Sequence, residues 1–197
     1  MKDRNLTTRI KFFSSNEKGS VAIEFVLIMI VLAFIFAFMA DLVFMRSSLG
    51  KLDNASYSLV NVLRERRQLY DETISGSKTI TNSDLVTFRK LASQILYGDN
   101  SHDNDVIIVL EQLTFTGETP ILPHTKLGDD SKCPPATSLD KLKDLSPRSE
   151  INGERKIPLY QVTVCMNIGS GLFRALLAKD STKLDGMLRS SSLGVSR

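Results

Sequence analysis

The chain has 197 residues, of which 42% are hydrophobic and 24% are charged, and its formal net charge is +3. This length allows one modest domain with an anchor, and this composition excludes both a polytopic membrane protein and a disordered chain. The basic and acidic residues before Ser20 account for the whole net charge, so the rest of the chain is formally neutral. Because no basic face with interleaved aromatic residues follows, we expect no nucleic-acid partner.

The apolar run between Val21 and Met45 predicts a single transmembrane helix. Glu24 and Asp41 are its only charged residues, and at about 1.5 Å per residue it exceeds the roughly 30 Å hydrocarbon core of a bilayer. A cleaved secretory signal would have a shorter apolar region and small residues at the cut, which this run lacks. The basic residues before the run place residues 1–19 in the cytoplasm, residues 20–45 in the membrane and residues 46–197 beyond it.

The segment that leads into this run is Gly19-Ser20-Val21-Ala22-Ile23-Glu24-Phe25. A carboxylate at the edge of a membrane is tolerated, so the position of Glu24 alone also fits an incidental interfacial acid. With the basic leader and the apolar helix, however, the segment resembles the processing site of type IV prepilins, in the G-x4-E-[FY] form of the tight-adherence (Tad, or Flp) pilus system. The roughly 150 residues beyond the membrane resemble in size the minor pseudopilins TadE and TadF, and TadF more closely.

The resemblance implies that a prepilin peptidase cuts between Gly19 and Ser20 and removes a basic leader, residues 1–19. It implies a non-enzymatic pseudopilin of the bacterial inner membrane, with a periplasmic domain, no cofactor, and a role in pilus assembly, adherence and biofilm formation. Its partners would be the peptidase, other Tad pseudopilins, the Flp pilin or the membrane platform, and the lipid bilayer. Phe25 belongs to the same motif, and Glu24 lies one helical turn from the new amine of Ser20, with which it can pair.

Two other functions stay open on the sequence. One is an uncleaved, signal-anchored periplasmic module that binds something else, and the other is a minor pseudopilin of a type II secretion system.

Beyond the membrane we expect an α+β, pilin-like fold, in which the helix continues over residues 46–70 and a small antiparallel sheet lies in a domain of residues 71–197. An apolar seam at helical spacing, interrupted by Ser56, is expected to face the core, and its members are Leu42, Met45, Leu49, Leu52, Leu59 and Leu63. A second helix is expected over residues 81–98, with Asn82 or Ser83 as N-cap and Gly98 as its stop. Its predicted apolar face is Leu85, Phe88, Leu91, Ala92 and Ile95.

Three strands are expected in this domain. Residues 105–115 are rich in β-branched side chains and predict a central strand, and residues 159–168 and 187–195 predict two more. A long proline-rich loop is expected over residues 117–157, with a helical turn near residues 138–145, and a short helix is expected over residues 172–179.

Cys133 and Cys165 are predicted to form a disulfide. Both lie on the predicted periplasmic side, where disulfides form readily. Cys165 belongs to a predicted strand and Cys133 to the proline-rich loop, and a loop of this length in a compact domain needs a tether or a function. The alternative is a buried and an exposed free thiol.

His102 and His124 are expected to be surface residues in polar or proline-containing loops. A metal or catalytic role would need partners such as Asp103 or Asp129 to converge on them, and no ligand spacing indicates this. The chain has no Walker loop, nucleophile elbow, HExxH motif or Cys-x-x-Cys motif. We therefore expect no metal site, no catalytic residues and no enzyme.

Overall fold

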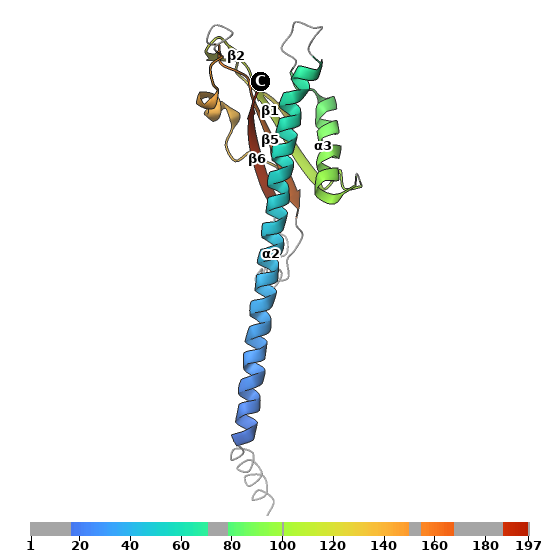
Figure 1. Ribbon diagram of the computed structural model, residues 1–197, viewed down its shortest axis with the longest axis vertical. Coiled ribbons are helices and arrows are strands. Elements are labelled where there is room, and N and C mark those ends of the chain that lie inside the picture. Colours follow the sequence, from blue (N-terminus) through green and yellow to red (C-terminus); the bar gives the residue numbers. More distant parts are fainter. Residues whose placement is uncertain (1–16, 71–78, 100, 150–154, 168–186, 197) are drawn as a thin grey trace, which may run out of the picture.

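One helix, α2 (Glu17–Tyr70), dominates the computed structural model, which describes residues 17–70, 79–99, 101–149, 155–167 and 187–196. Its 54 residues extend over about 80 Å. No proline interrupts it, and Gly50 lies within it without ending it. Figure 1 shows that only its second half is next to the rest of the domain, while the first half projects away from it. The helix is continuous as far as Tyr70, the predicted last residue, and the residues directly after it lie outside the described ranges.

The second helix, α3 (Asn82–Tyr97), lies beside the far end of α2. Its N-cap is Thr81, and the predicted caps Asn82 and Ser83 are wrong. The Asp84 carboxylate accepts hydrogen bonds of 2.9 Å from both the amide and the hydroxyl of Thr81, which fixes the turn one residue earlier. Gly98 ends the helix with φ +85°, as predicted.

The predicted apolar face of α3 is right except at its last position. Phe88 and Ala92 are buried and Leu85 and Leu91 are partly buried, but Ile95 is exposed. Leu96 is buried in its place. The buried stripe Leu85, Phe88, Ala92 and Leu96 thus keeps the three- and four-residue spacing of one helix face, and Ile95 lies beside that face.

A four-stranded antiparallel sheet forms the centre of the domain, with the order β4-β1-β5-β6. The strands are β1 (Val106–Leu113), β4 (Thr125–Gly128), β5 (Leu159–Asn167) and β6 (Met187–Val195). The predicted central position of β1 is confirmed, and β5 and β6 match the other two predicted strands. The fold is α+β, as expected, while the helix predicted over residues 172–179 lies outside the described residues.

The segment predicted as a long loop contains more structure than expected. Two short strands, β2 (Phe115–Thr116) and β3 (Thr119–Pro120), form a hairpin at its start, and β4 extends the sheet from within it. The predicted helical turn is the 3-10 helix η1 (Leu139–Leu145). β4 was not predicted, because its four residues include a lysine and show no clear alternation of apolar and polar side chains.

Both faces of the sheet are covered. α2 and α3 pack on one face, and η1 with the chain between β4 and η1 packs on the other. The core on the helical side contains the buried residues Leu52, Ala55, Leu59, Val60, Leu63, Ile80, Phe88, Ala92, Leu96, Val106, Ile108, Leu110, Tyr160, Val162 and Val164. The smaller core on the opposite side contains Leu113, Phe115, Leu139, Leu159, Val109, Cys133 and Cys165.

Candidate functional site

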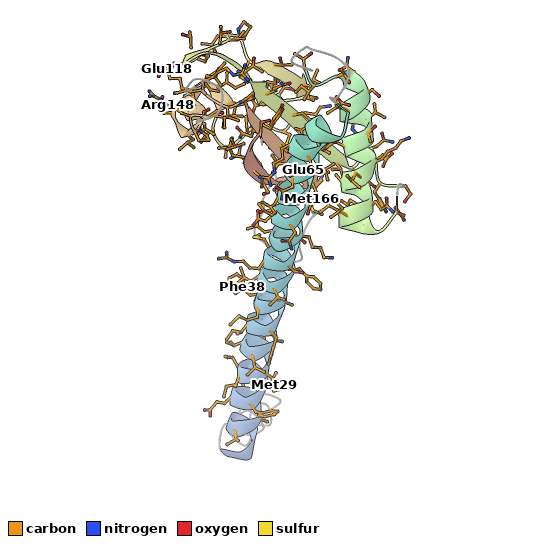
Figure 2. The ribbon with its side chains drawn as sticks, turned by 45° about the horizontal axis from the view of Figure 1, so that its top comes forward. Met29, Phe38, Glu65, Glu118, Arg148 and Met166 are labelled. Atoms are coloured by element: carbon orange, nitrogen blue, oxygen red, sulfur yellow. A yellow bond between two sulfur atoms is a disulfide. The ribbon has the colours of Figure 1, made fainter. Side chains whose placement is uncertain are left out.

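The first half of α2 presents apolar side chains in all directions. The side chains of residues 21–36 are all exposed, and Figure 2 shows them projecting around Met29 and Phe38, where no other described element approaches the helix. Contacts within the described chain therefore do not account for this surface. A helix of this length and composition fits a single-pass membrane anchor.

The predicted processing motif lies at the start of this helix. α2 begins at Glu17, so the backbone of Gly19 and Ser20 belongs to its first turn. Glu24 and Phe25 follow and are exposed. Because four residues advance a helix by about 6 Å and slightly more than one turn, Ser20 and Glu24 are on the same side of α2.

Among the residues that the structure describes, the predicted seam of α2 is buried from Leu52 onward, and Leu49 just before it is partly buried. Leu42 and Met45 are 39% and 37% exposed, whereas Leu52, Leu59 and Leu63 are buried. The first residues of the seam, Leu42 and Met45, therefore belong to the exposed apolar surface of the first half of α2 and not to the core.

Ser56, which interrupts the seam, is a polar contact between α2 and the sheet. Its Oγ lies 2.9 Å from the Oγ of Ser190 and 2.8 Å from the Oγ of Ser192, both on β6. It is also 3.1 Å from the carbonyl oxygen of Asp53. Because the rest of the seam is apolar, the hydrogen bonds of Ser56 fix the position along α2 at which β6 packs.

The predicted Cys133–Cys165 disulfide is present, with the two Cα atoms 5.9 Å apart. Both cysteines are buried and pack with Val109 on the face of the sheet opposite the helices. The side-chain amide of Gln161 donates to the Thr137 carbonyl at 3.1 Å and holds the same segment further along. The disulfide thus joins the proline-rich segment to β5 as a third layer of the domain.

A buried polar cluster around Glu111 was not predicted. Glu111 is on β1 and is completely buried, and its Oε1 lies 3.0 Å from Nε2 of His124. The other ring nitrogen of His124 lies 2.7 Å from Oδ1 of Asp140 on η1. The prediction of a surface His124 is therefore wrong, since its side chain is only 10% exposed, whereas His102 is exposed as predicted and lies 2.9 Å from Asp105.

His124 thus connects three separate parts of the domain: the central strand, the segment before β4, and η1. Its partners are Glu111 and Asp140 rather than Asp103 or Asp129. The available signal was Glu111 itself, because a carboxylate within a predicted central strand needs a buried partner. The cluster offers ion pairing and hydrogen bonding and contains no nucleophile.

The turn after β4 carries a small group of charges on the surface. A hydrogen bond from Ser131, supported by Lys132, lowers the pKa of Asp129. The Lys126 ammonium, 2.6 Å away, lowers the pKa of Asp130. Partial burial lowers the pKa of Lys126, but Asp130 and Glu111 outweigh this and raise it overall. Within the described ranges, no three His, Cys, Asp or Glu side chains are placed to hold a metal ion together.

The candidate residues lie in two distant places. The motif from Gly19 to Phe25 is at the free end of α2, and the disulfide is in the domain at its other end. Residues 12–197 match the protein family TadF, described as "Putative tight adherence pilin protein F". No curated protein and no solved structure matches the chain significantly. The family match covers the motif, α2 and the whole domain, so the chain belongs to the TadF family.

Proposed function

We propose that this protein is a minor pseudopilin of a Tad/Flp pilus, made as a precursor that a prepilin peptidase cuts between Gly19 and Ser20. In this proposal the leader is cytoplasmic, α2 crosses the bacterial inner membrane once, and the domain is periplasmic. The observation that carries the proposal is the G-x4-E-F motif at the start of an apolar helix in a chain of the TadF family. The family is one of pilus components and not of enzymes, so membership in it supports a role in a Tad pilus and favours the Tad system over type II secretion.

Gly19 suits a cleavage site within a helix. A peptidase needs the scissile bond in an accessible, extended form, so the first turn of α2 must open before cleavage. Glycine is less favourable in a helix than alanine by about 1 kcal/mol, which lowers the cost of that opening. A bulky aliphatic residue at this position would hold the turn closed and fill the space next to the bond.

Glu24 suits an assembly of helices better than an isolated helix. An ionised carboxylate near lipid is costly, and cleavage would create an ammonium group at Ser20 that is costly for the same reason. Pairing of the two, within one subunit or between neighbours, would offset both costs and define the vertical position of one helix against another. The exposed side chain of Glu24 leaves it available for such a partner.

The experiment is a comparison of three variants produced at wild-type levels in a piliated strain. Glu24→Ala and Glu24→Gln should insert into the membrane and be processed, because they remove a charge from a membrane segment, yet they should lose pilus assembly and adherence. Val26→Ala, a neighbouring exposed position, is the matched control and should assemble normally. Normal piliation by both Glu24 variants would show that the carboxylate has no role in assembly.

A further inference from the structure

The two edges of the sheet are open within the described part of the chain. No backbone group of β4 or β6 forms a hydrogen bond there except to its neighbouring strand. β6 is an edge of nine residues without proline, and Arg189 is its only charged residue. Ser196 N–H bonds to the Pro158 carbonyl, so by alternation the backbone groups of residues 189, 191, 193 and 195 point outward. Such an edge is a template for another strand.

The direction of each edge strand follows from its contacts with α2. Ser56 contacts Ser190 and Ser192, and Val60, one turn farther from the anchor, packs against Gly194. β6 therefore runs in the same direction as α2, away from the membrane. Since every neighbouring pair in the order β4-β1-β5-β6 is antiparallel, β4 runs back toward the membrane.

The directions of the two edge strands decide which edges of two copies can pair when both copies are anchored in one membrane. Two upright copies cannot pair β6 with β6 in antiparallel fashion, because one copy would then be inverted. β6 of one copy and the β4 of the next are already antiparallel when both copies stand upright. An even number of alternating strands thus makes the two edges of one subunit complementary in direction.

The register makes the edges complementary in charge as well. One row across the sheet contains Gly128, Val109, Thr163 and Ser191. If this row continues into a second copy, Gly128 of that copy lies opposite Ser191. Arg189 precedes Ser191 by two residues on β6, and Asp130 follows the last residue of β4 by two, so the turn of the second copy that carries Asp130 would lie beside Arg189.

The surroundings of Arg189 suit an acidic partner. Its guanidinium donates to the Pro134 carbonyl at 2.8 Å, and no carboxylate pairs with it among the described residues. It borders a hollow of about 310 Å³ lined by Lys132, Pro134, Cys165, Met187, Leu188 and Arg189, with no acidic residue in that lining. On the opposite edge, the side chains of Asp129 and Asp130 are 44% and 55% exposed, although each already has a lysine partner in its own chain.

We propose that copies of this protein in one membrane associate head to tail, with β6 of one copy against β4 and the Asp129–Asp130 turn of the next. Such a contact joins two different surfaces, so it extends as an open row or helix unless the rotation closes a ring. The contact is short. Because both copies are anchored in one membrane, each meets the other at a raised effective concentration, which favours even a short contact. The inference rests on the proposed function only for the shared orientation of the anchors, and it does not require cleavage.

Cross-linking between two variants, each with one added cysteine, tests the contact. Full-length Arg189→Cys and Asp130→Cys chains with different tags are co-expressed in membranes and treated with a short bismaleimide, after peptide mapping has verified that the Cys133–Cys165 disulfide persists beside residue 189. We expect the mixed cross-linked dimer to exceed either homodimer several-fold. Val86→Cys, on the exposed face of α3, is the matched control and should not cross-link to Arg189→Cys. A mixed product no stronger than this control, or Arg189→Cys homodimers as abundant as the mixed product, would overturn the proposal.

A charge exchange without new cysteines provides a second test. When all copies carry Arg189→Glu, two differently tagged forms should co-purify several-fold less than wild type, and Arg189→Glu with Asp130→Arg should restore the wild-type level. Failure of the double variant to restore co-purification contradicts the proposed pair. Both tests are run in cells that lack the other pilus proteins and are repeated with the Gly19→Leu precursor. Failure of processing and failure of this contact are therefore seen separately.

Discussion

Glu111 shows how one charged residue can organise a domain of this size. It lies in the centre of the sheet, and its carboxylate meets His124 at 3.0 Å and Lys126 at 3.7 Å. Burial of a carboxylate is favourable only when such partners are fixed in place. These side chains thereby connect two other parts of the domain to the central strand. One part is η1, and the other is the segment that precedes β4.

Replacement of Glu111 tests this organising role. We expect Glu111→Ala to lower the free energy of unfolding by about 2–4 kcal/mol, because it leaves His124 and Lys126 without their buried partner. The matched control is Glu118→Ala, which removes an exposed carboxylate 2.7 Å from Arg148 and should cost about 1 kcal/mol or less. Pulse proteolysis in urea measures both. Equal effects of the two substitutions would show that the Glu111 cluster contributes nothing beyond a surface ion pair.

Two glycines are predicted to respond in opposite directions to alanine. Gly128 ends β4 with φ +110°, and a Cβ there would collide with the Ile108 carbonyl oxygen, so Gly128→Ala should destabilise the domain by roughly 2 kcal/mol or more. Gly50 lies in α2 with no atom near its missing Cβ, so Gly50→Ala should not destabilise it and should gain up to about 1 kcal/mol. The same urea series decides this, and a destabilising Gly50→Ala would contradict the account of α2 as an unstrained helix.

At the scale of elements, the disulfide converts a proline-rich segment into a covering layer. The stretch between β4 and η1 contains no helix or strand, yet its Cys133 is buried against the sheet, and η1 adds Leu139 to the same side. A covering segment with so few backbone hydrogen bonds depends on covalent and side-chain attachments for its stability.

Removal of the disulfide should therefore weaken the domain without unfolding α2. The closed loop spans 32 residues in sequence, for which chain entropy suggests roughly 3–4 kcal/mol. We expect the double variant Cys133→Ser/Cys165→Ser to lose this amount in urea, and alkylation of the unfolded, unreduced wild-type protein to label no cysteine. Two labels on wild-type protein isolated from membranes would mean that the bridge does not form in the cell.

The elements that could be predicted are those with a long, regular pattern. The uninterrupted apolar run and its seam predict α2 as one continuous helix, and alternation or β-branching predicts β1, β5 and β6. The N-cap of α3 could not be predicted, because Thr81, Asn82 and Ser83 are all suitable caps and only the position of Asp84 decides between them. β4 and the partners of Glu111 depend on contacts between segments far apart in the sequence.

At the scale of the whole molecule, the structure separates two tasks. The free half of α2 has the apolar surface of an anchor, and the domain at its other end is fastened to α2 by Ser56 and the buried leucines that follow. The processing motif and Glu24 could be proposed from sequence because they are local in the chain. The open edges of the sheet could not, since strand order and direction are properties of the assembled domain.

The most direct test of the proposed function is the mass and N-terminal sequence of the mature protein, isolated from cells with and without the prepilin peptidase. With the peptidase, the chain should begin at Ser20 and be about 2 kDa lighter than the precursor, since 19 residues are removed. Without it, and in Gly19→Leu, the precursor should persist. A wild-type protein that retains residues 1–19 in cells with an active peptidase would contradict the account and favour an uncleaved anchor.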